Sequence, residues 1–424
     1  MRVLLGIQYY YPLSNGGTEL YVSQISKELS LIGHTVAILK TGNENDYIHD
    51  GIQVFVIPEH SFQNLDEDKN NYQKEVLNQF ESILDLFKPD IFHLHTLHAY
   101  LNAHFLKIAS KKSIKCVFTA HLPGIGCPRG DMLLMGKKQC DGVIITSRCL
   151  QCALDGNKKR NTFFLKNLLT FIYSINKKII KRSSALQSVI YTKEQMHLLE
   201  RYTDLIITPS EWQKSAFIIN RFNCSKQKVV RLGVSEIFLT KKKTANDQSK
   251  NLIIGFIGRN THIKGLHILL QAIKESFLKD VELHICLSIS EEEKEVESAK
   301  MDAFRKIYPL KIFYNLPKIE LIDVLDNCDV LCVPSMVAET GPYVVYEALS
   351  RGVPVVGSDI GGIKEVIKDG INGLLFKTGS ISDLTKKLNQ LANDSFLTKL
   401  KTNAYYNTSE SVMASEIISL YKAI

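Results

Sequence analysis

The sequence predicts an α/β protein with two domains, each built around a parallel β-sheet. The chain has 424 residues, which exceeds what one hydrophobic core usually organises. Strand-like and helix-like segments alternate through the first half, and the alternation restarts after a polar stretch at 241–250. Repeated β-α-β units give parallel sheets with right-handed crossovers, and ligands of such sheets bind beyond the carboxyl ends of the strands.

The first half begins with an apolar strand at 1–7, a Gly-rich turn at 15–18 and a helix from 19 to about 32. The other strands are short apolar runs bounded by helix breakers, which is typical of strands buried on both faces. We predict these strands at 35–40, 52–57, 91–95, 116–120, 205–209 and 229–232, with a helix at about 71–87.

The second half repeats the pattern, with strands at 252–257, 281–287, 311–314, 330–334 and 354–358 and a helix at 265–276. We therefore expect two Rossmann-like domains whose sheets face each other across a cleft. The predicted boundaries are 1–240 for the N-terminal domain, 251–405 for the C-terminal domain, and 406–424 for a C-terminal helix that packs back on the N-terminal domain.

The composition is that of an ordinary globular protein, with 45% apolar and 23% charged residues. No apolar run reaches the roughly 18 residues that a membrane-spanning helix needs. The first residues read as a strand and lack the cleavage site of a signal peptide. We expect a cytoplasmic protein whose nine cysteines are reduced thiols or metal ligands.

The formal net charge of +8 is concentrated in one segment. Residues 157–190 carry eight Lys and Arg and no Asp or Glu. The positive charge of this segment alone therefore equals the net charge of the whole chain. Apolar side chains recur at helical spacing between 164 and 179. They predict either an amphipathic helix that contacts anionic lipid or a helix packed on the first sheet. We expect no nucleic-acid partner, because no nucleic-acid module accompanies the charge.

Two carboxylates in the second half suggest a ligand site. Glu339 and Glu347 are eight positions apart, slightly more than two helical turns. If 343–350 is helical, Glu347 lies in the helix and Glu339 in the loop before it, so both can face one cleft. Gly341 lets backbone amides approach a ligand, and a helix N-terminus favours an anionic one. Taken singly, each carboxylate is more often a solvated surface group.

A basic pair follows the first strand of the second half. Arg259 and Lys264 lie in the segment 258–265, which leaves a strand and begins a helix. Such a turn is suited to a diphosphate, because Arg binds phosphate through two parallel hydrogen bonds and Lys supplies a point charge. The alternative is that both side chains are simply solvated.

A diglycine turn, Gly16-Gly17, stands between the first strand and the first helix. It is either a tight connection or a place where backbone comes close to a phosphate. The Gly-rich fingerprint of dinucleotide-binding folds is absent, which argues against NAD as a cofactor.

Histidines and cysteines form two further groups. His95 and His121 each follow an apolar strand, and we expect His93 to point away from His95. Four cysteines within 26 residues end in a Cys-x2-Cys pair. They predict a structural zinc site or an iron–sulfur cluster, and otherwise unconnected thiols or occasional disulfides. The four are Cys127, Cys140, Cys149 and Cys152.

The stretch from 334 to 375 resembles the signature of glycosyltransferase family 4, whose members are retaining enzymes with the GT-B fold. The match includes Glu-x7-Glu at 339–347, Glu-Ala-Leu-Ser-Arg-Gly-Val-Pro-Val-Val at 347–356 and Gly-Gly-Ile-Lys-Glu at 361–365. The resemblance implies transfer of a sugar from a UDP- or GDP-linked donor to a glycan or lipid-linked acceptor, without a catalytic metal. It also implies a role in cell-surface polysaccharide or glycoconjugate synthesis, with peripheral attachment at the inner face of the membrane.

The resemblance also assigns roles to single residues. It implies that Glu347 binds the donor ribose, that Glu339 orients the donor sugar, and that His121 lies near the reacting centre. Some family members carry a cysteine-rich insertion like that at about 122–155. The residues implied to hold the donor phosphates and sugar are Gly16, Gly17, Arg259, Lys264, Thr340, Gly341 and Pro342.

Other functions remain open on this architecture. A nucleotide-sugar epimerase or a phosphorylase shares it, although we identify no lysine that would bind the pyridoxal cofactor of a phosphorylase. A binding module that recognises a nucleotide sugar without turnover is a further alternative. The full set of Arg259, Lys264, Glu339 and Glu347 argues against the binding module.

Overall fold

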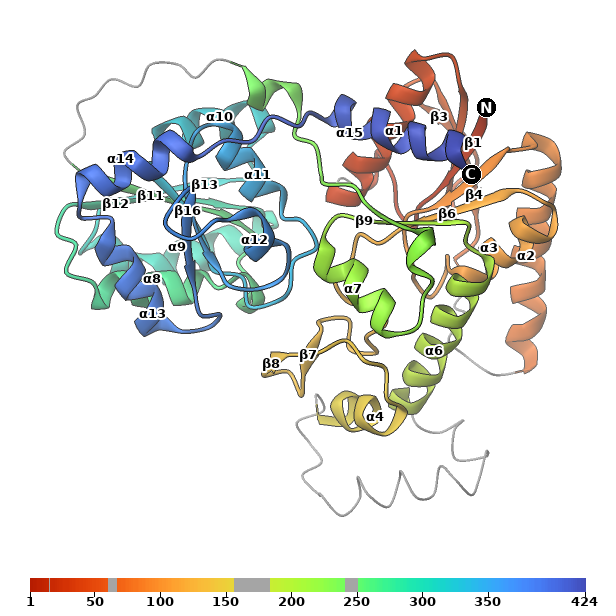
Figure 1. Ribbon diagram of the computed structural model, residues 1–424, viewed down its shortest axis with the longest axis horizontal. Helices are drawn as coiled ribbons and strands as arrows, with labels where there is room; N and C mark the ends of the chain where they lie inside the picture. Colours follow the sequence, from red (N-terminus) through yellow and green to blue (C-terminus); the bar gives the residue numbers. More distant parts are fainter. Residues whose placement is uncertain (15, 60–66, 156–183, 241–250) are drawn as a thin grey trace. The chain divides into compact units, whose positions relative to one another are not determined.

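The computed structural model describes residues 1–14, 16–59, 67–155, 184–240 and 251–424. They form two compact units, Met1–Arg231 with Ser411–Ile424, and Leu232–Glu410. Each unit is a parallel sheet covered by helices, so the predicted α/β class with two parallel sheets is confirmed (Figure 1). The predicted basic helix within 157–182 and the polar stretch 241–250 lie outside the described residues.

The first unit contains an eight-stranded sheet, in which only the edge strand β3 is antiparallel to its neighbour. Its central strands are mostly apolar because helices cover both faces, and Val3, Leu4 and Leu5 of β1 are fully buried. In spatial order the strands are β10 (Gln227–Val229), β9 (Leu205–Thr208), β6 (Lys115–Thr119), β5 (Ile91–Leu94), β1 (Arg2–Gly6), β2 (Thr35–Thr41), β4 (Ile52–Ile57) and β3 (Tyr47–His49).

The helices of the first unit pack an aromatic and aliphatic core against this sheet, in which Phe80 contacts both Phe92 and Phe105. The last helix of the chain belongs to this unit, and its Tyr421 hydroxyl lies 2.5 Å from His93 Nδ1 in β5. The helices are α1 (Gly17–Leu31), α2 (Glu67–Phe87), α3 (Ala103–Lys111), α4 (Thr146–Asp155), α6 (Ser184–Tyr202), α7 (Glu211–Ile219) and α15 (Glu410–Ala423); a small hairpin, β7 (Leu133–Leu134) and β8 (Lys138–Gln139), precedes α4.

The second unit contains a six-stranded parallel sheet. Strand order reverses between β11 and β14, and in open α/β sheets ligands bind at such a switch point, beyond the carboxyl ends of the strands. The spatial order is β13 (Leu310–Tyr314), β12 (Val281–Leu287), β11 (Leu252–Gly258), β14 (Val330–Val333), β15 (Val355–Ser358) and β16 (Gly373–Phe376).

Helices cover both faces of this second sheet (Figure 1) and bury residues such as Leu269, Leu283 and Leu384. The helices are α8 (Leu266–Glu275), α9 (Glu291–Arg305), α10 (Lys318–Asn327), α11 (Tyr343–Ser350), α12 (Gly361–Val366), α13 (Ile381–Gln390) and α14 (Asp394–Asn403).

Two features of the first sheet differ from the sequence prediction. The last strand was expected at 229–232 but is β10, Gln227–Val229, because only these residues pair with β9. The short β3 was not predicted, since three residues are too few to show an alternating pattern.

Candidate functional site

The carboxyl ends of β11 and β14 bring together a lysine and a glutamate of the predicted donor site. Lys264 Nζ donates a hydrogen bond to Glu339 Oε1 at 2.6 Å, and the two side chains form an ion pair. Both are only partly exposed, at 26% and 17% of the side chain, so the charges are less screened than those of a surface pair. The pair stands at the switch point of the second sheet, where the fold favours a ligand.

The turn that presents Lys264 is held tightly against the loop after β14. Gly265 has a φ of +77°, and a Cβ at this position would lie 2.0 Å from the carbonyl oxygen of Pro334. The amide of Met336 donates to the carbonyl of Ile263 at 2.7 Å. Only glycine satisfies both the positive φ and the close approach, so this residue determines where the ammonium of Lys264 points.

The loop that carries Glu339 is anchored by its neighbours. The Ser335 hydroxyl donates to Glu339 Oε1 at 2.9 Å, and the Gly362 amide donates to the Glu339 carbonyl at 2.7 Å. Gly361, at a φ of +55°, would place a Cβ 2.7 Å from Ala338 Cα. The diglycine of α12 therefore packs on the backbone of this loop and fixes the Glu339 carboxylate.

Three further predicted donor residues directly precede α11. Thr340 is buried, Gly341 is partly exposed, and Pro342 is the N-cap of the helix. Arg259 follows β11 directly, and its side chain is exposed. The structure thus puts Lys264 and Glu339 in direct contact, while Arg259 lies on the same βα connection as Lys264.

Glu347 lies inside α11 and is more buried than the sequence suggested, with 5% of its surface exposed. Burial raises its pKa to about 7, an effect that Lys318 opposes and Glu410 reinforces. A buried carboxyl that resists ionisation does not fit the alternative of a solvated surface group.

Glu347 should make the stability of the second unit depend on pH. Between its ordinary pKa of 4.5 and the raised value of about 7, the folded chain holds a proton that the unfolded chain has released. The free energy of unfolding should therefore fall as pH rises through this window and stay lower above it. Replacing Glu347 with Gln should remove this fall, which is on the order of 1–3 kcal/mol.

Urea unfolding at about pH 5 and pH 8 measures this effect, with Glu291→Gln at the exposed start of α9 as the control. If the free energy of unfolding of Glu347→Gln fell between the two pH values as much as that of the parent chain, Glu347 would not be the group responsible.

In the first unit, the predicted Gly16-Gly17 turn leads into α1, with Gly16 as the N-cap. Glu19, which the sequence analysis did not single out, bends back over this turn. Its carboxylate accepts a hydrogen bond from the Ser14 hydroxyl at 2.5 Å, and a Cβ on Gly16 would lie 2.7 Å from it. The acidic group offsets the positive end of the helix, as a phosphate would.

A cluster of histidines lies at the carboxyl ends of β5 and β6. His95 Nδ1 is 3.1 Å from His121 Nε2, and the Tyr21 ring packs edge-on against His121 with centroids 4.4 Å apart. His93 Nε2 is 2.7 Å from the Thr119 hydroxyl. The expectation that His93 points away from His95 was wrong: the two rings lie 3.9 Å apart, because residues i and i+2 of a strand share a face.

Burial keeps these imidazoles neutral. It lowers the pKa of His121 to about 3 and depresses the pKa values of His93 and His95 well below their usual range. His121 can therefore exchange a hydrogen bond with a ligand at neutral pH but is not a source of positive charge.

The four cysteines of the predicted metal site line one small cavity beside the β7–β8 hairpin and α4. Their present arrangement is not that of a metal site, since the described part of the chain contains no group of three or more His, Cys, Asp or Glu side chains placed to hold an ion. Nor does any described helix have the length and apolar character needed to cross a membrane.

Comparison with known proteins matches both halves of the chain. The pattern of the group 1 glycosyl transferases fits residues 238–410, and that of glycosyltransferase family 4 fits residues 15–157. The chain belongs to the group 1 glycosyltransferases of family 4. This assignment confirms the resemblance seen in the sequence and makes the chain a glycosyltransferase that uses a nucleotide-sugar donor.

Individual relatives of this glycosyltransferase are distant. A 42.6 kDa protein in the cps region of Klebsiella pneumoniae is 24% identical over 391 residues, which cover 86% of this chain and 87% of that protein. The N,N'-diacetylbacillosaminyl-diphospho-undecaprenol alpha-1,3-N-acetylgalactosaminyltransferase of Campylobacter jejuni is 30% identical over 120 residues, or 27% of this chain and 31% of the relative.

Among solved structures, Anabaena Alr3699/HepE in complex with UDP and glucose superposes with a TM-score of 0.66. The match covers 100% of both chains at 17% identity. The likeness at this low identity confirms the GT-B fold.

Proposed function

We propose that this enzyme transfers a sugar, with retention at the anomeric carbon, from a UDP- or GDP-linked donor to a glycan or lipid-linked acceptor in the synthesis of cell-surface polysaccharide or glycoconjugates. The observation that carries the proposal is the contact between Lys264 and Glu339 at the switch point of the second sheet. The name of the Campylobacter relative and the UDP complex of HepE support the substrate class.

In the proposed reaction the bond between the anomeric carbon and the diphosphate breaks while the acceptor oxygen attacks from the same face. The acceptor proton passes to the departing phosphate oxygen, so no carboxylate of the enzyme acts as nucleophile. The ammonium of Lys264 and the guanidinium of Arg259 stabilise the charge that grows on the diphosphate. These two cations take the part that a divalent metal plays in other transferases, so we propose that catalysis is independent of metal.

Donor binding rearranges the site in this proposal. The Lys264 ammonium exchanges Glu339 for phosphate oxygens, and the released carboxylate accepts hydrogen bonds from sugar hydroxyls. Glu347 binds the ribose hydroxyls, and amides of Thr340, Gly341 and the following helix contact the sugar and phosphate. The remaining donor contacts are proposed for Pro342 and for Gly16 and Gly17 of the first unit.

We propose that the acceptor binds in a pocket of the first unit, which has a volume of about 440 Å³. Its wall includes Leu122, which follows His121 directly and has 48% of its surface exposed, and Tyr191 of α6. We place the reaction on the cytoplasmic side of the membrane. Peripheral attachment through the basic segment 157–182 is a further proposal.

Release of nucleoside diphosphate from a panel of UDP- and GDP-linked sugars tests the function. We expect one donor to release its diphosphate only when acceptor glycans or lipid extracts are present, with equal rates with and without added Mg²⁺ or Mn²⁺. NMR of the new linkage measures its anomeric configuration, which we expect to be that of the sugar in the donor. Interconversion of the donor sugar without release would instead identify an epimerase, and binding without any turnover would identify a binding module.

His95 is expected to position His121. Its Nε2 is buried and has no hydrogen-bond partner in the described part of the chain. This favours a proton on Nδ1, which donates to His121 Nε2, because a buried N–H without a partner is rarer than a buried lone pair. His121, which we propose lies near the donor sugar, then carries its own proton on Nδ1.

Replacing His95 with Ala should lower kcat about tenfold and leave the donor KM nearly unchanged, because the sugar would lose orientation rather than affinity. His95→Asn retains an N–H near the original Nδ1 and should restore part of kcat. His197→Ala, on the exposed face of α6, is the control. Equal kcat values for His95→Ala and the parent enzyme would rule out this role.

A further inference from the structure

The four cysteines that the sequence analysis singled out come from three consecutive segments of the chain and line one cavity. Cys127 precedes the β7–β8 hairpin, and Cys140 follows it directly. The other two come from α4, where a spacing of three residues puts them on one face of the helix. We call the four residues the thiol cluster: Cys127, Cys140, Cys149 and Cys152, which all line one cavity.

The size of this cavity limits what it can hold. Its volume is about 20 Å³, little more than the space that one water molecule occupies. A space of this size is enough for a single ion among the four sulfurs.

The surroundings supply the interactions that thiolate ligands need. The amide of Met135 donates to Cys152 Sγ at 3.1 Å, a type of hydrogen bond that stabilises a metal-bound sulfur. The guanidinium groups of Arg129 and Arg148 also line the cavity. Each is held by a nearby aspartate, Asp131 at 3.0 Å and Asp141 at 2.5 Å. A zinc ion with four thiolates carries a net negative charge, which cationic neighbours of this kind accommodate.

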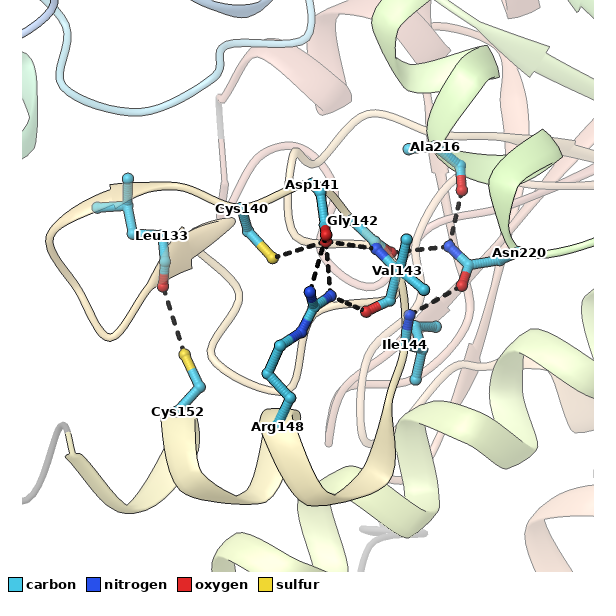
Figure 2. Close-up of polar contacts among 10 residues, drawn as sticks. All are labelled: Leu133, Cys140, Asp141, Gly142, Val143, Ile144, Arg148, Cys152, Ala216 and Asn220. Atoms are coloured by element: carbon cyan, nitrogen blue, oxygen red, sulfur yellow. Dashed lines mark hydrogen bonds and ion pairs between the residues drawn. The ribbon is translucent and has the colours of Figure 1, made fainter.

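Two of the sulfurs now donate hydrogen bonds to oxygens in the wall (Figure 2). Cys140 Sγ lies 3.7 Å from Asp141 Oδ1, and Cys152 Sγ lies 3.5 Å from the Leu133 carbonyl oxygen. These contacts belong to protonated thiols and turn the sulfurs away from a common centre. When a metal–sulfur bond forms, the thiol proton leaves to solvent and the contact to oxygen is lost.

We propose that the thiol cluster binds one soft divalent metal ion, with zinc as the natural occupant, in a closed tetrahedral site of structural function. Zinc fits because it favours four thiolates and needs no open coordination position. The ion would join the segment before the hairpin, the end of the hairpin and α4.

The site has a consequence for the neighbouring pocket, which rests on the proposed function. Four residues line both the thiol cavity and the proposed acceptor pocket: Gly126, Cys127, Pro128 and Arg129. An ion on Cys127 would hold this shared wall in place, a few residues after His121. We therefore expect metal removal to raise the acceptor KM more than the donor KM.

Metal analysis of the full-length chain tests the proposal directly. The protein is purified with a reductant and without chelator, and we expect about one zinc per chain. Replacement by Co²⁺ should give the thiolate-to-metal charge-transfer and visible bands of a tetrahedral site. Cys149→Ser should weaken Co²⁺ binding at least tenfold, whereas Cys224→Ser, at an exposed cysteine outside the cluster, should leave it unchanged.

Several results would overturn the proposal, and none depends on transferase activity. The first is full-length chain that takes up neither zinc nor Co²⁺ under reducing conditions. The second is iron with inorganic sulfide in place of zinc. The third is fewer than nine free thiols per chain when the protein is denatured without reductant, since missing thiols would indicate disulfides. Because the Co²⁺ spectrum is recorded on the parent chain, a variant that fails to fold does not prevent the test.

Discussion

Replacing Lys264 with Met is expected to lower kcat/KM for sugar transfer by about two to three orders of magnitude. The loss of one preorganised group that stabilises charge in the transition state typically has an effect of this size. Lys264 is such a group because Gly265 and the Pro334 loop fix its turn, so little reorganisation is needed when the diphosphate departs. Met retains most of the length and volume of the side chain, which limits the change to the charge.

The structure offers a matched control for this variant. Lys401 pairs with Asp329 at 2.5 Å, and Asp329 precedes β14, at the opposite end of the same sheet. Lys401→Met breaks a Lys–Asp pair in the same unit and should leave kcat/KM within about twofold, because this pair lies away from the carboxyl ends of the strands, where we propose that the donor binds. A loss below tenfold for Lys264→Met would contradict a role on the diphosphate.

The partner of Lys264 sharpens the test. Glu339 accepts hydrogen bonds from both Lys264 and Ser335. If both charged groups act on the same donor, the losses from Lys264→Met and Glu339→Gln should not add in the double variant. Additive losses would mean that the two residues act independently.

Much of the second unit could be predicted from the sequence, because its determinants are local. The strands are continuous apolar runs, and the turn containing Gly265 combines a basic pair with a glycine. The contact between Lys264 and Glu339 also follows from the pattern, once β11 and β14 are placed as neighbours on either side of the switch point.

What the sequence does not reveal depends on long-range packing. The burial of Glu347 results from how α11 lies in the unit, and the pattern of the helix alone does not indicate it. Glu19 bends over the α1 turn through a contact with Ser14 that no motif encodes. For His93 the error was one of periodicity, since residues i and i+2 of a strand share a face and therefore predict adjacent rings.

Replacing Arg351 with Met is expected to lower the free energy of unfolding of the second unit by about 3–5 kcal/mol. Arg351 is almost fully buried and binds both carboxylate oxygens of Asp326, at 2.8 and 2.7 Å. It also donates to the carbonyl of Thr240 at 2.6 Å, so one side chain joins α10, the end of α11 and the start of the unit. Removing it leaves a buried carboxylate without its partner, which is far more costly than breaking an exposed pair.

Urea unfolding followed by far-UV circular dichroism measures this change. The single tryptophan, Trp212, lies in α7 of the first unit, so its fluorescence reports that unit separately. Arg305→Met is the control, because Arg305 pairs with Asp302 on an exposed helix face and its loss should be within about 0.5 kcal/mol. A change below about 1 kcal/mol in Arg351→Met would show that Asp326 finds water or another partner.

The double variant Arg351→Met with Asp326→Leu separates two explanations of the loss. If the main cost is the unpaired carboxylate, replacing both partners by apolar groups should recover most of the stability, as found for other buried ion pairs. If the main loss is instead the link from Arg351 to the Thr240 carbonyl, the double variant should remain as unstable as the single one. We expect recovery of more than half, because an unpaired buried charge costs more than a lost hydrogen bond to a backbone carbonyl.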